Sequence, residues 1–435
     1  MTPLIRTFQA LAATLACGPA LANHGAPVEG APQAILVQGH HDNAVGTSDA
    51  ASAGVIRGEL LQSRPAQRPG EVLAFVPGVV VTQHSGDGKA NQYFLRGFNL
   101  DHGTDFATRV AGMPVNLPSH GHGQGYSDLN FLLPELVERI DYRKGPYTAA
   151  VGDFAGAGSA DIRYRSRVAA PFGQITLGAH GFVRGVAGAS ADVAPGTTLL
   201  GAVELMGNDG PWTVPEGLRK ANAVLTLTGG TYAEGWSASA MDYRARWTAT
   251  DQVPQRLIDA GQLNGQPFGR YDSLDLSAGG TSRRSSLSAD WHRSSAAGRS
   301  TLQVYAIRSD LGLFSNFTYA MDRPAAGDQF KQTDRRTVLG ADASHTIDHD
   351  IGPWPARSTV GLQLRRDTIR VGLYDSVARA VTATVRDDAI GQTQTGLYAQ
   401  TAVEWTPTLR AVLGLRLDHL AAQVDAISLP ANGGR

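Results

Sequence analysis

The sequence is poor in cysteine, in net charge and in long apolar runs. Its 435 residues include a single cysteine, Cys17, and 38 basic residues stand against 39 acidic ones. Because these charges cancel, there is no field of one sign to attract nucleic acid or acidic lipid. Beyond the N-terminus, no apolar run reaches the roughly 18 residues that a membrane-spanning helix needs. The chain therefore offers no helix that crosses a membrane and no sign of a nucleic-acid partner.

The N-terminus has the composition of an export signal. Arg6 precedes an apolar run over residues 8–16, and the small-residue site 20–22 follows, so we expect cleavage after Ala22. A retained anchor is the weaker interpretation, because the run is too short to cross a bilayer as a helix. Lipidation of Cys17 is a minor alternative. An exported chain without a spanning helix is either a soluble periplasmic protein or a β-barrel.

Composition separates an arm and a small domain from the rest of the chain. Residues 23–52 are rich in Ala, Gly, His, Asp and Asn, and we expect a flexible arm there. Residues 53–165 combine a short helix near 70–76 with short strands and glycine-rich turns, which predicts a small α+β domain. The strands are expected at residues 78–82, 92–96, 108–111, 137–142 and 160–164.

From residue 170 to residue 435, apolar and polar side chains alternate with a period of two, which is typical of strands. Clear examples are residues 241–247, 286–292, 360–365 and 409–418. A soluble sandwich also alternates. Three features favour an antiparallel transmembrane barrel instead: segments of about 9–11 residues, several full charges on the opposite face, and aromatic residues near segment ends. Tight turns such as 194–196 alternate with long loops such as 252–272 and 316–331, as in barrels of the outer membrane.

The end of the chain does not resemble the last strand of a closed barrel. About 10–12 strands precede residues 429–435, which have the composition of a loop. An open sheet edge would leave unpaired backbone groups in lipid. We therefore expect either a truncated reading frame, which is favoured, or missing strands that are supplied elsewhere.

The α+β domain resembles the plug domain of TonB-dependent outer-membrane receptors. The resemblance rests on five segments in the family's order: residues 68–79, 91–98, 110–115, 136–146 and 152–162. It implies a plug domain at 53–165 and the N-terminal part of a transmembrane barrel at 170–435, with about 10–12 of the family's about 22 strands. It also implies a receptor, not an enzyme, in the outer membrane of a Gram-negative bacterium. Such a receptor takes up a scarce nutrient, here expected to be an iron–siderophore complex, and needs no cofactor.

The resemblance further implies contacts with the energy-transducing protein TonB, with outer-membrane lipid and with a small-molecule metal chelate or a metal ion. TonB pairs with an exposed β-prone segment, the TonB box. The candidate box lies near residues 34–39, and its central residues are Ile35, Leu36 and Val37. A chance apolar island is the alternative.

Charged residues of the plug domain are candidates for contacts with the barrel wall, because a plug needs charge partners inside a polar lumen. The candidates are Arg96, Glu138, Arg139 and Arg143. Solvated surface charge is the alternative for each of them.

Histidines provide the most distinctive local chemistry. The candidate ligands are His84, His102, His120 and His122, the last two within the glycine-rich segment 119–125. Neutral imidazole suits zinc, copper and nickel, so a receptor for a transition metal is the alternative function. Hydrogen bonding to the barrel wall is the plainer interpretation. Two further hypotheses are a non-transporting remnant and a metal-dependent hydrolase that uses His120, His122 and Asp128, although no general base is identifiable.

Overall fold

The computed structural model describes residues 52–63, 68–249 and 251–428. The expected export signal, nearly all of the expected arm and the candidate TonB box with Ile35, Leu36 and Val37 lie outside the described residues. In the described part of the chain, no helix combines the length and the apolar character needed to cross a membrane.

The plug domain consists of two small sheets and short helices. Its elements are β1 (Ala53–Arg57), α2 (Gly58–Ser63), the 3-10 helix η1 (Pro69–Phe75), β2 (Val79–Thr82), β3 (Gln92–Leu95), β4 (Phe98–Asn99), β5 (Phe106–Val110), β6 (Met113–Pro114), the 3-10 helix η2 (Pro134–Leu136), β7 (Val137–Arg143) and β8 (Gly158–Tyr164). One sheet has the order β1-β7-β8-β5-β6 and the other the order β2-β3-β4. The pairing of β5 with β8 is parallel, which makes the larger sheet mixed.

The short helix and the five strands expected in this domain are present, although the helix is of the 3-10 type. The first strand and helix, β1 and α2, were not anticipated. β1 pairs with β7, placing Ile56 opposite Ile140. Both side chains are fully buried, together with Val110, Leu132 and Ile162. The plug domain therefore has an apolar core of the kind found in soluble proteins.

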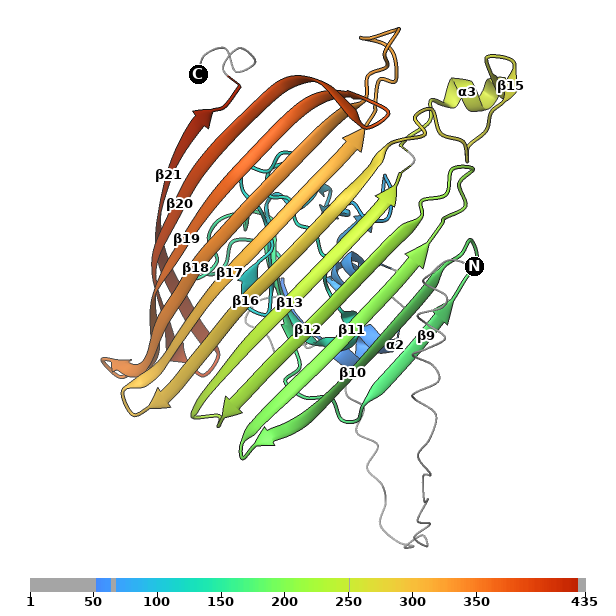
Figure 1. The fold of residues 1–435 in the computed structure, drawn as a ribbon. Coiled ribbons are helices and arrows are strands. Elements are labelled where there is room, and N and C mark those ends of the chain that lie inside the picture. The colour runs from blue at the N-terminus through green and yellow to red at the C-terminus, as the bar shows by residue number, and fades with distance from the viewer. Residues whose placement is uncertain (1–51, 64–67, 250, 429–435) are drawn as a thin grey trace, which may run out of the picture. The chain divides into compact units, whose positions relative to one another are not determined.

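Among the described residues that follow the plug domain, eleven strands form one antiparallel sheet in sequence order. Its strands are β9 (Phe172–Leu177), β10 (Val183–Ala194), β11 (Thr197–Asn208), β12 (Leu218–Gly230), β13 (Glu234–Thr248), β16 (Gly279–Ser295), β17 (Gly298–Ser315), β18 (Phe330–Ile351), β19 (Trp354–Val377), β20 (Ala380–Thr406) and β21 (Leu409–Ala426). Figure 1 shows these strands side by side, with the plug domain in blue and cyan behind them. The count confirms the expected 10–12 strands.

The strands are longer than the expected 9–11 residues. Apart from β9, they run from 12 residues in β10 to 27 in β20. At about 3.4 Å per residue, the longest strands exceed the roughly 30 Å hydrocarbon thickness of a bilayer. The strand length expected from the sequence was wrong because it counted only the segments that alternate with apolar residues. Strand pairing continues beyond those segments. The expected long loop at 252–272 contains α3 (Gln255–Ala260), β14 (Gln262–Leu263) and β15 (Gln266–Pro267).

The two faces of this sheet are opposite in polarity. Leu225, Leu287 and Leu339 on three different strands are 51%, 61% and 53% exposed. By contrast, Glu204 and Asp334 are each only 1% exposed. Successive side chains of a strand point to opposite faces, so the alternation read from the sequence places apolar groups on one face and charged groups against the plug domain.

Candidate functional site

One loop of the plug domain, residues 116–122, is bound to the sheet by buried charges. Arg336 of β18 donates through Nη1 to the carbonyl oxygen of Pro118 at 3.0 Å and through Nη2 to that of Ser119 at 3.1 Å. Arg336 also pairs with Asp334 at 2.7 Å and with Asp367 at 3.1 Å. These three side chains are at most 1% exposed. A buried arginine thus satisfies two carboxylates and two loop carbonyl groups at once.

Gly121 allows the loop to approach the sheet closely. Its amide N–H donates to Asp334 Oδ2 at 3.1 Å, and its carbonyl oxygen accepts from Gln332 Nε2 at 2.7 Å. A Cβ atom at Gly121 would lie 2.8 Å from Val371 Cγ2 and 3.1 Å from the carbonyl oxygen of Thr333. The absence of a side chain therefore lets both backbone groups of Gly121 bind the sheet.

Three of the four predicted histidines lie together, and one of them, His122, belongs to this loop. The Nε2 atoms of His122 and His102 are 3.2 Å apart. His122 Nδ1 lies 2.8 Å from Gln332 Oε1, and His102 Nδ1 lies 3.1 Å from the carbonyl oxygen of Asn91. The ring of His84 is 5.1 Å from that of His102, measured between centroids. The fold thus joins histidines from three separate plug loops.

His120 lies beside this group but is oriented differently. Its ring stacks on Tyr126, with centroids 4.2 Å apart and planes 6° from parallel. Nδ1 accepts the backbone N–H of His122 at 3.2 Å, and Nε2 is 3.8 Å from Asp334 Oδ2. His122 is therefore paired with His102, and His120 faces the carboxylate of Asp334.

Burial keeps the histidines neutral. Burial lowers the pKa of His84 and of His120 to about 4 and that of His122 to about 2. The pKa of His102 is also lowered, first by burial and then by the positive charge of Lys89. Lys89 Nζ lies 3.1 Å from His84 Nε2, and burial lowers the pKa of Lys89 to about 8. Desolvation disfavours the charged form of every one of these bases.

The described residues do not contain a complete protein-built metal centre. No group of three or more His, Cys, Asp or Glu side chains among them could hold a metal ion. The carboxylate of Asp101 has its Oδ1 atom 3.8 Å from His102 Nε2. Asp128 instead accepts hydrogen bonds from the Asn130 N–H at 2.8 Å and from Ser282 Oγ at 3.2 Å. The three-residue arrangement considered for a hydrolase is therefore not assembled.

Two of the four charged residues predicted to contact the barrel wall have partners within the plug domain. Arg96 Nη2 donates to Ser52 Oγ at 2.9 Å, and Arg139 Nε donates to Asp141 Oδ2 at 3.1 Å. Glu138 and Arg143 are exposed. Contacts of these four residues with the barrel wall stay a prediction.

Other ionic side chains of the plug domain do reach the sheet. Glu135 Oε1 accepts from Arg184 Nη1 of β10 at 2.6 Å, and Arg109 pairs with Asp342 of β18. Nothing in the sequence distinguishes Glu135 and Arg109 from the plug domain's other charges, because the facing barrel residues lie far along the chain. The sequence shows that the plug domain carries charged residues, but it does not show which residues of the sheet they pair with.

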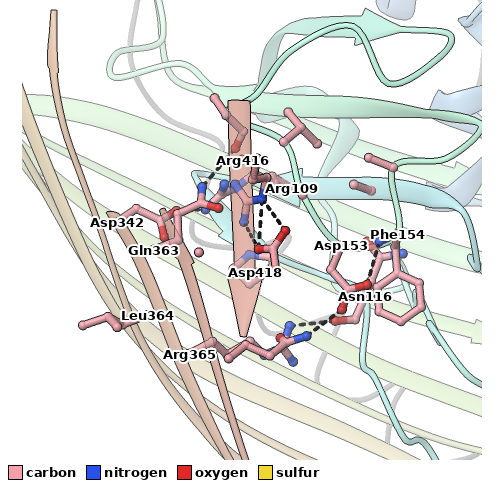
Figure 2. Close-up of a pocket in the computed structure, with 18 of the residues that line it drawn as sticks. Arg109, Asn116, Asp153, Phe154, Asp342, Gln363, Leu364, Arg365, Arg416 and Asp418 are labelled. Carbon is pink, nitrogen blue, oxygen red and sulfur yellow. Dashed lines mark hydrogen bonds and ion pairs between the residues drawn. The ribbon is translucent and has the colours of Figure 1, made fainter. Parts of the chain in front are cut away.

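A cavity of about 490 Å³ lies between the plug domain and strands β17 to β21. Figure 2 shows Arg365 reaching Asn116, where its Nη1 donates to the carbonyl oxygen at 3.0 Å. Gln394 Nε2 donates to Asp153 Oδ2 at 2.6 Å on the same side. The boundary between the plug domain and the sheet is therefore polar and hydrogen-bonded here as well.

Comparison with known proteins agrees with this architecture. Residues 47–159 match the TonB-dependent receptor plug domain, and residues 212–429 match the TonB-dependent receptor-like β-barrel. Among solved structures, the ferric citrate transporter FecA is 15% identical with a TM-score of 0.70, the copper transporter OprC 18% with 0.65, and the siderophore receptor PirA from Acinetobacter baumannii 16% with 0.62.

These structures match most of this chain, but the chain spans little more than half of each. The matches cover 86%, 85% and 86% of this chain and 56%, 56% and 58% of FecA, OprC and PirA, respectively. At such identities the likeness shows the fold alone. The matched plug and barrel families, the mixed-sheet plug domain and the eleven-stranded sheet nevertheless agree with one another. The chain belongs to the TonB-dependent receptors, a family of outer-membrane receptors and transporters rather than enzymes.

Proposed function

We propose that this protein is an outer-membrane receptor of a Gram-negative bacterium that takes up a scarce nutrient, an iron–siderophore complex in the first place. Family membership supports uptake. The similar structures include a ferric citrate transporter, a siderophore receptor and a ferric enterobactin receptor. The apolar outer face of the sheet suits contact with lipid, because apolar residues face the hydrocarbon in membrane barrels.

The observation that carries this proposal is the polar attachment of the plug domain to the sheet. An uptake receptor must hold its plug firmly at rest and still let it move when cargo passes. Hydrogen bonds such as those from Arg336 to the Pro118 and Ser119 carbonyl oxygens can be exchanged for water. An extensive apolar interface would lose its free energy of burial on opening. The attachment therefore combines specificity with reversibility.

Energy for opening would come from TonB through the segment near residues 34–39. Strand addition requires an exposed β-prone segment, and its main-chain hydrogen bonds provide affinity. Ile35, Leu36 and Val37 provide the β-prone side chains of such a segment. Replacing Leu36 with proline removes a main-chain donor and is expected to abolish uptake without affecting insertion in the membrane.

A divalent transition metal is the second candidate cargo. It is favoured by one specific observation, the approach of His102 Nε2 to His122 Nε2 at 3.2 Å. The similarity to a copper transporter shows that this fold is compatible with such cargo in another protein.

Uptake by intact cells tests the proposed function. The chain is expressed in a strain that lacks its own receptors, with and without TonB, and accumulation of labelled ferric siderophores, cobalamin, zinc and copper is measured. We expect accumulation of one of the metal cargoes only when TonB is present. Heat-modifiable migration in electrophoresis reports insertion separately. A protein that inserts but accumulates none of these cargoes would contradict uptake, and one that never inserts would support the non-transporting remnant.

A further inference from the structure

The hydrogen bonds of His102 fix where its proton lies. Nδ1 is 3.1 Å from the carbonyl oxygen of Asn91. A carbonyl oxygen only accepts, so Nδ1 of the neutral ring carries the hydrogen and Nε2 carries the lone pair. His102 is 3% exposed, and its ring is held in this orientation by the packed loop around it.

The same reasoning applies to His122. Gln332 donates its Nε2 to the carbonyl oxygen of Gly121 at 2.7 Å, which fixes the amide orientation. Gln332 Oε1 therefore faces His122 Nδ1 at 2.8 Å and accepts its hydrogen. The Nε2 atom of neutral His122 then also carries a lone pair.

Two acceptor nitrogens thus face each other at 3.2 Å with no hydrogen between them. A third acceptor, Asp101 Oδ1, lies 3.8 Å from His102 Nε2. Such an arrangement is electrostatically unfavourable unless a cation occupies the space. Two nitrogens bound to one tetrahedral ion at about 2.0–2.1 Å lie about 3.3 Å apart. The observed separation matches that value, and histidine ligands generally donate their other N–H to a carbonyl or amide oxygen.

We propose that His102 Nε2 and His122 Nε2 are a two-nitrogen docking site for a divalent transition-metal cargo of the zinc, copper or nickel class. The proposal rests on the proposed uptake function and favours its second candidate cargo, the transition metal, over the iron–siderophore complex. The remaining coordination positions are filled by ligands that arrive with the metal, because the described residues offer no third side chain in position. The Asp101 side chain is 48% exposed and leaves the site open to solvent on that side.

This chemistry selects against a ferric siderophore. Imidazole is a good ligand for zinc, copper and nickel, whereas hard oxygen ligands surround iron in a chelate that has no free position. A partly coordinated divalent ion can instead exchange two of its ligands for His102 and His122. The two-ligand site holds the cargo loosely enough to release it when the plug moves.

Metal binding to the purified full chain tests the site. Calorimetric titration with Zn²⁺ against a competing chelator, and Cu²⁺ electron paramagnetic resonance, are performed on wild type, His102→Gln, His122→Gln and Gln332→Met. We expect one ion per chain and a copper signal split by two imidazole nitrogens. Each histidine replacement should weaken binding at least about tenfold, and Gln332→Met about 10–100-fold.

The matched control is His180→Asn. His180 is exposed and has a φ of 55°, a conformation that asparagine tolerates, so binding by this variant should equal that of wild type. Heat-modifiable migration of each variant checks its folding. The copper spectrum of wild type tests the site even if a variant fails to fold.

Two results would overturn the site: wild type that binds no metal, or His122→Gln that binds as wild type does. If wild type binds no metal and nitrogen NMR shows a proton shared between the rings of His102 and His122, protonation explains the close approach of their Nε2 atoms. If the metal site fails these tests but cells accumulate ferric siderophore only when TonB is present, the proposed uptake function still stands. Binding by the purified chain without accumulation in cells would instead support the site and contradict the proposed function.

Discussion

The plug domain and the eleven-stranded sheet use the same alternation of side chains in opposite ways. In the plug domain, Ile140 of β7 and Ile162 of β8 are fully buried. In the sheet, Leu287 is 61% exposed while Asp334 and Arg336 are 1% and 2% exposed. The period of two determines only that one face is apolar. The surroundings decide which face is outside: water surrounds a soluble domain, whereas hydrocarbon surrounds a barrel and its lumen is polar.

Replacement of the buried Arg336 should have the largest effect on the free energy of unfolding. Arg336→Ala leaves the carboxylates of Asp334 and Asp367 buried without their partner. Breaking a buried pair in this way costs about 3–5 kcal/mol, measured as the free energy of unfolding in detergent. As a control, Arg357 pairs with Asp348 in an exposed position, and Arg357→Ala should change the same quantity by about 0–1 kcal/mol. Equal effects would show that the lumen side is not truly buried.

The second-largest difference is expected when one leucine in each region is replaced with alanine. Leu132→Ala creates a cavity in the plug core, and we expect a loss of about 2–5 kcal/mol in the free energy of unfolding. Leu287→Ala on the outer face of β16 leaves no enclosed cavity and should have a much smaller effect. Similar losses at both positions would mean that the outer face packs against protein instead of lipid.

A charge on the outer face tests the lipid contact directly. Leu287 lies near the middle of β16, opposite Ala240 and Ala306 on its neighbours. Leu287→Arg should cost about 2–4 kcal/mol if this position lies at the centre of the bilayer, and less nearer the interface. Reversible unfolding from lipid vesicles measures the difference. A neutral effect would contradict burial of Leu287 in hydrocarbon.

The last expected effect is a pH dependence where the plug domain meets a loop of the barrel. Glu216, between β11 and β12, accepts the Asp87 N–H at 3.0 Å and Trp212 Nε1 at 2.7 Å. Burial, and then repulsion from the Asp87 carboxylate, raises the pKa of Glu216 from 4.5 to about 7.

The sign of this dependence follows from the raised pKa in the folded state. The protonated form contributes stability below pH 4.5, and that contribution is lost as the pH rises to about 7. Denaturant midpoints measured across this range should fall with increasing pH. Glu216→Gln cannot titrate and should flatten that dependence, whereas an unchanged slope would assign it to another group.

Much of the architecture could be predicted from the sequence because its signals are local. The alternation in residues 241–247 and 286–292 depends only on near neighbours and correctly placed strands there. The lengths of β18 to β20 could not be predicted, since pairing outside the apolar band leaves no hydrophobic pattern. The strand β1 escaped notice because its five residues become a strand only through pairing with β7, more than eighty residues later.

The sequence by itself determined the fold family, the polarity of each strand and the presence of histidines in the glycine-rich plug loops. It could not determine which histidines meet. His120 and His122 are two residues apart, yet the ring partner of His122 is His102, because Gln332 and the buried Arg336 on β18 hold loop 116–122 in place. Local patterns follow from backbone geometry, whereas the partners of polar side chains depend on surfaces that only the tertiary structure brings together.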